Sequence, residues 1–216
     1  MPRAAIFGST GLIGSELLKY INDDKYFSEV NVITRKNIPF KNSKFKNIVI
    51  DFNDIDSIKS SLKECEVVFV SIGTTQSKVK WDLEKYKKID YEIPINISKA
   101  CIELNIEKYL IVSSAGANIN AKGFYLSLKG KIENEIINMG IKNTYIYRPS
   151  LLLGKRNENR FGEKIAQVIM PIFSFLLPKK YKPINAEFVA KSMINSSKNT
   201  INSVKIFHYV DIIKSK

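Results

Sequence analysis

The sequence feature that most constrains this chain is a run of three evenly spaced glycines near its start. Gly8, Gly11 and Gly14 separate an apolar segment at 3–7 from an amphipathic one at 12–22. At a strand-to-helix turn, this spacing permits a tight turn, the approach of a pyrophosphate to the backbone, and close packing of helix on strand. The free amides at the helix start then face the phosphates. We therefore expect a dinucleotide to bind at Gly8, Ser9, Thr10, Gly11, Leu12, Ile13 and Gly14.

Short apolar runs alternate with longer amphipathic segments over the first two thirds of the chain, which is typical of repeated strand-helix units around a parallel sheet. The runs are continuously hydrophobic, as strands covered on both faces require. This pattern predicts an α/β fold with a doubly wound parallel sheet. The expected strands are Arg3–Phe7, Val30–Thr34, Asn47–Ile50, Val67–Ser71, Tyr109–Ser113 and Thr144–Tyr147. The expected helices are Leu12–Asn22, a short one after Asp54, Leu83–Leu104 with a kink at Pro94, and Phe124–Met139.

The length of 216 residues fits one domain with a continuous core. We predict a single dinucleotide-binding domain over 1–216, in which 150–216 form a small substrate-side cap. Within this cap we expect an apolar helix near Phe161–Leu177 and a helix after Asn185, whose side chain would cap it. Lysines follow the first of these helices, so an alternative to a buried cap helix is weak contact with an anionic membrane surface.

The end of the second predicted strand indicates which dinucleotide is bound. In such folds a carboxylate here binds the ribose hydroxyl of NAD, whereas a guanidinium accommodates the 2′-phosphate of NADP. This chain has Arg35 and Lys36, which predicts that NADP(H) is preferred to NAD(H). Asp51 could accept a hydrogen bond from the adenine, and the small turn at Gly73 and Thr74 would leave room for the ribose and pyrophosphate. The alternative for these three residues is an ordinary structural role in a loop.

A serine pair and a tyrosine-lysine pair predict acid-base chemistry. Ser113 and Ser114 end the fifth expected strand, and Tyr125 and Lys129 lie four residues apart on the next helix, so they share a face. An adjacent ammonium stabilises a phenolate and brings the pKa of a phenol down from about 10 toward neutral pH. A serine hydroxyl at the strand end can hold a substrate oxygen against that phenol. The alternative is a chance match at the rim of an amphipathic helix.

Together these motifs resemble the short-chain dehydrogenase/reductase superfamily in its extended or atypical, epimerase/dehydratase-like branch. The residues that support this are Gly8-x-x-Gly11-x-x-Gly14, Ser113-Ser114, Tyr125-x-x-x-Lys129 and Tyr147-Arg148-Pro149. The segments 72–75 and 124–131 are similar to the Tat-interacting metastasis-suppressor reductases and their bacterial relatives.

The resemblance implies a Rossmann fold that binds NADP(H), and it implies a role for each matching residue. Tyr125 would be the catalytic acid or base, and Lys129 would contact the nicotinamide ribose and lower the pKa of the tyrosine. Ser114, the second serine of the pair, would position the carbonyl, while Arg148 and Pro149 would line the nicotinamide side. The predicted function is therefore NADP(H)-dependent oxidation or reduction of a small alcohol or carbonyl compound. The alternative is an NADP(H)-binding sensor or interaction protein with little turnover, because the substrate region is short.

Composition argues against several other classes of protein. The formal net charge of +13 favours anionic partners, but the lysines are spread along the chain and no nucleic-acid motif accompanies them, so we expect no nucleic-acid binding. The two cysteines lack disulfide or metal-ligand patterns. No apolar run is long enough for a membrane span, and no signal peptide is evident. We therefore expect a cytoplasmic protein without a metal. The single histidine, His208, is expected to be a strand residue rather than a catalyst.

Overall fold

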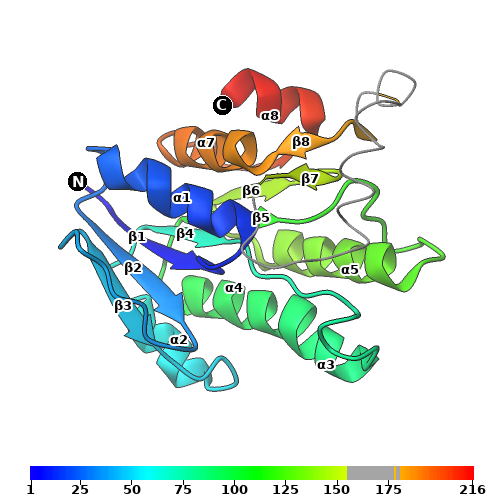
Figure 1. Cartoon of the computed structure of the whole chain (residues 1–216), viewed down its shortest axis with the longest axis horizontal. Helices are drawn as coiled ribbons and strands as arrows, with labels where there is room; N and C mark the ends of the chain where they lie inside the picture. Colours follow the sequence, from blue (N-terminus) through cyan, green and yellow to red (C-terminus); the bar gives the residue numbers. More distant parts are fainter. Residues whose placement is uncertain (155–177, 179–180) are drawn as a thin grey trace.

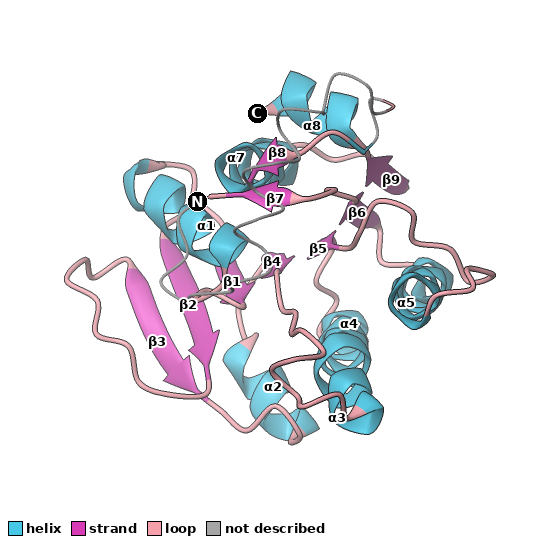
Figure 2. Cartoon of the chain, turned by 45° about the vertical axis from the view of Figure 1, so that its right-hand side comes forward, coloured by secondary structure: helices cyan, strands magenta, loops and turns pink. Residues whose placement is uncertain are grey.

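The computed structural model describes residues 1–154, 178 and 181–216. Its centre is a seven-stranded sheet of order β3-β2-β1-β4-β5-β6-β9 in which all neighbouring strands are parallel. Figure 1 shows the sheet between its helices, and Figure 2 shows the edge strand β9 beside β6. The strands are β1 (Arg3–Phe7), β2 (Glu29–Thr34), β3 (Phe45–Val49), β4 (Val67–Val70), β5 (Lys108–Val112), β6 (Asn143–Tyr147) and β9 (Val204–Phe207). The predicted doubly wound α/β sheet is confirmed. The third strand begins and ends earlier than the sequence pattern indicated.

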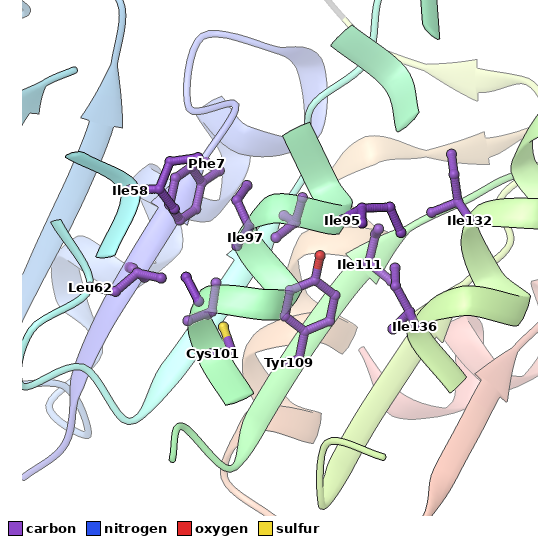
Figure 3. Packing of buried hydrophobic residues seen from close by; sticks show 14 of the residues in the cluster. Phe7, Ile58, Leu62, Ile95, Ile97, Cys101, Tyr109, Ile111, Ile132 and Ile136 are labelled. Carbon is purple, nitrogen blue, oxygen red and sulfur yellow. The ribbon is translucent and has the colours of Figure 1, made fainter. Parts of the chain in front are cut away.

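Helices cover both faces of the sheet (Figure 2). On one face lie α1 (Leu12–Asp23), α7 (Ala186–Ser197) and α8 (Tyr209–Ser215). On the other lie α2 (Ile55–Ser61), α4 (Ile93–Glu103) and α5 (Phe124–Met139). Each layer has its own apolar core, and Figure 3 shows the second, in which Phe7 and Tyr109 of the sheet pack against isoleucines of α2, α4 and α5. Two-sided burial explains why the strand sequences are continuously hydrophobic.

The segment predicted as one helix over Leu83–Leu104 is divided into three parts. It consists of α3 (Leu83–Lys87), a π-helical turn η1 (Lys88–Glu92) and α4. Pro94 lies in the first turn of α4, where the missing N–H of proline needs no partner. The irregularity therefore lies upstream of Pro94, in the π-turn, and this turn contains the buried Asp90.

The C-terminal third contributes to the central sheet. Strand β9 pairs with β6 at its edge, and α7 packs against α1. A small parallel pair, β7 (Leu152–Leu153) and β8 (Ile184–Asn185), lies beside them. The helix expected near Phe161–Leu177 lies outside the described residues.

Two details of this region differ from the predictions. Asn185 is the N-cap residue of α7, but its side chain makes no capping hydrogen bond, so the predicted side-chain cap is wrong. His208 comes just after β9, where it is the N-cap residue of α8, and its backbone N–H donates to the carboxylate of Asp211. Because β9 ends at Phe207, His208 is not a strand residue, and that prediction is wrong.

Candidate functional site

The glycine turn joins β1 to α1 at the point where the strand order reverses. Strands β2 and β4 lie on opposite sides of β1, so the loops after β1 and β4 border a crevice at the carboxyl edge of the sheet. Gly8 has a φ of +86°, and a Cβ there would lie 2.7 Å from the backbone carbon of Ser71 after β4. A Cβ on Gly14 would lie 2.1 Å from the carbonyl oxygen of Gly8. Glycine is thus required at both positions for the helix to start this close to the sheet.

The start of α1 has the properties of an anion site. Gly11 is the N-cap residue and provides no side-chain cap, so the first amides of the helix have no intrahelical partner. Ser9 is 3% exposed, and its hydroxyl has no hydrogen-bond partner among the residues that the structure describes. A buried hydroxyl without a partner is costly unless a ligand satisfies it. The turn over Ser9–Gly14 therefore fits the pyrophosphate of a dinucleotide.

The loop after β2 presents two exposed cations. Thr34 donates its hydroxyl hydrogen to the carbonyl of Lys36 at 2.8 Å, and Asn47 of β3 donates to the hydroxyl oxygen of Thr34 at 2.7 Å. These bonds fix the path of the chain at Arg35 and Lys36, whose side chains are exposed. Among the described residues, no carboxylate lies within ion-pair distance of either one. Both cations are thus available for an anionic ligand at the edge of the crevice.

Asp51 follows β3 and is engaged in a local turn. Its Oδ1 atom accepts hydrogen bonds from the backbone and the side-chain amide of Asn53, at 2.9 and 2.8 Å. The residue is exposed. These bonds occupy one carboxylate oxygen and hold the side chain close to its own loop.

The loop after β4 is tied to the π-turn. The backbone N–H of Thr74 donates to Oδ2 of Asp90 at 2.7 Å, and Gly73 lies next to the same carboxylate. Asp90 is 1% exposed. The predicted ribose-binding turn at Gly73 and Thr74 is thus held by a buried acid that the sequence did not single out.

The serine pair follows β5, and its two hydroxyls differ. Ser113 is 8% exposed, and its hydroxyl has no hydrogen-bond partner within the described part of the chain. The Ser114 hydroxyl makes a long 3.4 Å bond to the carbonyl of Ala115. The backbone here is fixed because the N–H of Ser113 donates to Tyr147 and that of Ala115 to Pro149. Both serines remain candidates for the hydroxyl that holds a substrate oxygen.

The loop between β5 and α5 folds back along the helix. The N–H of Asn118 donates to the carbonyl of Leu126, and the Ser127 hydroxyl donates to the carbonyl of Ile119. Gly130 makes this contact possible, since a Cβ there would lie 2.3 Å from the backbone of Asn118 and Ile119. The glycine after Lys129 thus brings the loop that follows the serines against the helix that bears Tyr125.

Tyr125 and Lys129 lie on one face of α5, as predicted. Tyr125 is 40% exposed, whereas Lys129 is 5% exposed. The ammonium lies 5.9 Å from the centre of the Tyr125 ring and 3.1 Å from Oδ1 of Asp90. Burial by itself lowers the pKa of Lys129, but Asp90 and Tyr125 raise it, and the net result is a pKa above the ordinary lysine value. Lys129 is therefore a permanent cation behind an accessible phenol.

Arg148 follows β6, and its guanidinium is committed to Glu133 of α5. Its Nε atom lies 3.0 and 3.1 Å from the two carboxylate oxygens, and Nη2 makes a further contact. Glu133 is 3% exposed. Pro149 is buried, and its carbonyl accepts the N–H of Ala115. Both residues thus fix the ends of β5 and β6 against α5.

Sequence reasoning missed Asp90 and Glu133, the acids that partner Lys129 and Arg148. A signal for Asp90 was present, because it lies on the helix face that also includes Tyr86, Ile93, Pro94 and Ile97. A lone carboxylate on a buried face requires a cation or a hydrogen-bond donor. Which cation it meets depends on the packing of η1 on α5.

The described loops after β1, β2, β4 and β5, together with the start of α5, gather the predicted residues along one edge of the sheet. A doubly wound parallel sheet with an open helix N-terminus at its switch point defines a dinucleotide-binding protein of the Rossmann class. The chain belongs to the NAD(P)H-binding family, whose model matches residues 8–168. The NAD(P)-binding Rossmann fold that the resemblance implied is therefore confirmed.

The chain is also similar in sequence to fungal proteins and in fold to solved structures. It is 34% identical to "Protein FMP52, mitochondrial" of Candida albicans over 91% of this chain and 88% of that protein. It is 35% identical to the protein of the same name from Debaryomyces hansenii, with 89% and 86% covered. In structure it resembles MoeE5 in complex with UDP-glucuronic acid and NAD, with a TM-score of 0.73, 14% identity, and 96% of this chain and 75% of that chain covered. A UDP-N-acetylglucosamine 4-epimerase from Methanobrevibacter ruminantium gives a TM-score of 0.72 at 18% identity, with 96% and 76% covered.

The prediction of a cytoplasmic protein is wrong, because the similar fungal proteins bear names that place them in mitochondria. The prediction relied on cysteine usage and on the lack of a secretory signal. Both the cytosol and the mitochondrial matrix keep thiols reduced, so these features could not separate the two. Within the described residues, no helix is long and apolar enough to cross a membrane, and no three potential ligand side chains cluster as a metal site.

Proposed function

We propose that this protein is an NADP(H)-dependent oxidoreductase of the short-chain dehydrogenase/reductase type that acts on a small carbonyl or alcohol compound. The observation that supports this most directly is the pairing on α5 of an accessible phenol with a buried ammonium. Tyr125 is 40% exposed and Lys129 is 5% exposed, with the ammonium 5.9 Å from the ring centre. Lysine is rarely buried, and here the buried ammonium lies beside a tyrosine that stays accessible.

In this proposal the dinucleotide supplies or accepts the hydride when bound. Tyr125 donates a proton to the substrate oxygen during reduction and removes it during oxidation. Lys129 stabilises the phenolate that remains after donation. The hydroxyls of Ser113 and Ser114 are the candidates for orienting the substrate oxygen, and the unpartnered hydroxyl of Ser113 makes it a stronger candidate than the sequence suggested.

The cofactor preference for NADP(H) rests on the loop after β2. Arg35 and Lys36 are exposed and have no acidic partner among the described residues, and Thr34 and Asn47 fix the backbone that carries them. A 2′-phosphate can take up to two charge-assisted bonds from the guanidinium. The pyrophosphate is assigned to the amides at the start of α1, with Ser9 as an additional donor.

The test is oxidation of NADPH across a panel of small aldehydes and ketones. We expect turnover that falls by at least about 100-fold in Tyr125→Phe, the contribution typical of a general acid. Tyr20→Phe is the matched control, because Tyr20 lies on α1 and its hydroxyl bonds to Glu187 on α7. A rate that is equal in Tyr125→Phe and wild type would contradict the chemistry. Tight NADPH binding without turnover on any compound would instead support the sensor alternative.

A further inference from the structure

The buried acid Asp90 makes two contacts with the proposed catalytic site. One carboxylate oxygen lies 3.1 Å from the ammonium of Lys129, and the other accepts the N–H of Thr74 at 2.7 Å. The side chains of Asp90 and Lys129 are 2% and 6% exposed. A single carboxylate therefore joins the loop of the proposed cofactor site to the lysine behind the proposed catalytic phenol.

The π-turn η1 provides the position for this acid. A π-turn widens the helix locally, and such turns are often found at functional sites. It lies between α3 and α4 and contacts α5, the helix that contains Lys129. Placing a carboxylate here is costly unless it is paired, because a lone buried charge loses its hydration.

The pairing changes what Lys129 can do for Tyr125. Among the residues that the structure describes, the charged groups that act on Lys129 are Asp90 from η1 and Glu133 from α5, and Glu133 is itself paired with Arg148 at the end of β6. The ammonium next to the phenol is thus already balanced by a carboxylate. A balanced ammonium stabilises a phenolate less than an unpaired one does.

We propose that Asp90 is a positioning residue that fixes Lys129 and sets the pH range in which Tyr125 exchanges its proton. This inference rests on the proposed function and adds to it a residue that acts through Lys129. The negative charge of Asp90 makes it harder for the Tyr125–Lys129 pair to lose its first proton. This holds whether Tyr125 or Lys129 loses that proton, since either loss lowers the net charge beside the carboxylate by one.

The variant that tests this is Asp90→Asn, which keeps the shape and an oxygen that can accept the Thr74 N–H. The readout is the ring-carbon NMR signal of Tyr125 in protein labelled with ¹³C-tyrosine, assigned by its loss in Tyr125→Phe. We expect the first inflection of this signal to move to lower pH by about one unit or more. The basic limb of the pH profile for NADPH-dependent reduction should move by the same amount. Glu92→Gln, which removes an exposed acid from the same turn, should move neither.

A first inflection that stays in place in Asp90→Asn, or moves to higher pH, would overturn the inference. If this variant does not fold, Lys129→Met is compared with the double variant that also has Asp90→Asn. The double variant avoids an unpaired buried charge, and Tyr125 should ionise at lower pH in it than in Lys129→Met; equal values would overturn the inference. The titration needs no substrate, so a wild type without turnover refutes the proposed function alone. A wild type that turns over, with an unmoved profile in Asp90→Asn, refutes the role of Asp90 alone.

Discussion

Replacing Gly14 by alanine should displace α1 from the sheet and weaken dinucleotide binding. The new Cβ would lie 2.1 Å from the carbonyl oxygen and 2.7 Å from the carbonyl carbon of Gly8, so backbone must move by about 1 Å to relieve the overlap. Overpacking of this kind costs about 1–3 kcal/mol. In a chain of this size the loss corresponds to a decrease of roughly 2–12 °C in the melting temperature. Because the same movement displaces the amides of the glycine turn, NADPH affinity should fall as well.

The assay is thermal unfolding followed by circular dichroism, with and without NADPH, together with the dissociation constant from calorimetry. Gly123→Ala is the matched control, since a Cβ at this exposed helix start meets nothing within 4 Å. The alanine restricts the unfolded chain, which stabilises the fold, but it is a poorer N-cap residue than glycine, which destabilises it. The free energy of unfolding should therefore change by less than about 1 kcal/mol. If Gly14→Ala melts like wild type and binds NADPH equally well, the packing argument for the turn is refuted.

Three further predictions concern other parts of the site and the core. Arg35→Ala should weaken NADPH binding by roughly 10- to 100-fold, the value of charge-assisted hydrogen bonds, and leave NADH binding unchanged; equal losses for both in calorimetry would contradict the assigned 2′-phosphate contact. Gly130→Ala should destabilise the fold by about 1–3 kcal/mol while NADPH affinity falls less than in Gly14→Ala, because its Cβ overlaps the loop after β5 rather than the glycine turn. Burial raises the pKa of Cys65 from 9.0 to about 11, so the folded protein loses stability as pH rises between these values. The free energy of unfolding, measured with denaturant at several pH values, should fall less steeply with pH in Cys65→Ala than in wild type. An identical slope in both proteins would contradict this prediction.

The resemblance to a known superfamily and the glycine turn predicted much of the site, because these signals are local in the sequence. Gly8 and Gly14 indicate a particular turn, and Tyr125 and Lys129 share a helix face through their spacing alone. The packing of the β5–α5 loop on Gly130 joins residues that are adjacent in the fold but not in the sequence pattern. It could not be predicted without knowing the path of that loop.

The sequence by itself determined the first six strands and most of the helices between them, the glycine turn and the cations after the second strand, since each depends on hydrophobic period or on neighbours within a few residues. Only the tertiary structure decided which charges meet. Asp90 and Lys129 are far apart in the chain, as are Glu133 and the strand end with Arg148, and each pair forms because packing in the folded protein brings the two side chains together. The lysine that the sequence indicated as an activator of Tyr125 is thus revealed by the fold to be one half of a buried, neutral pair.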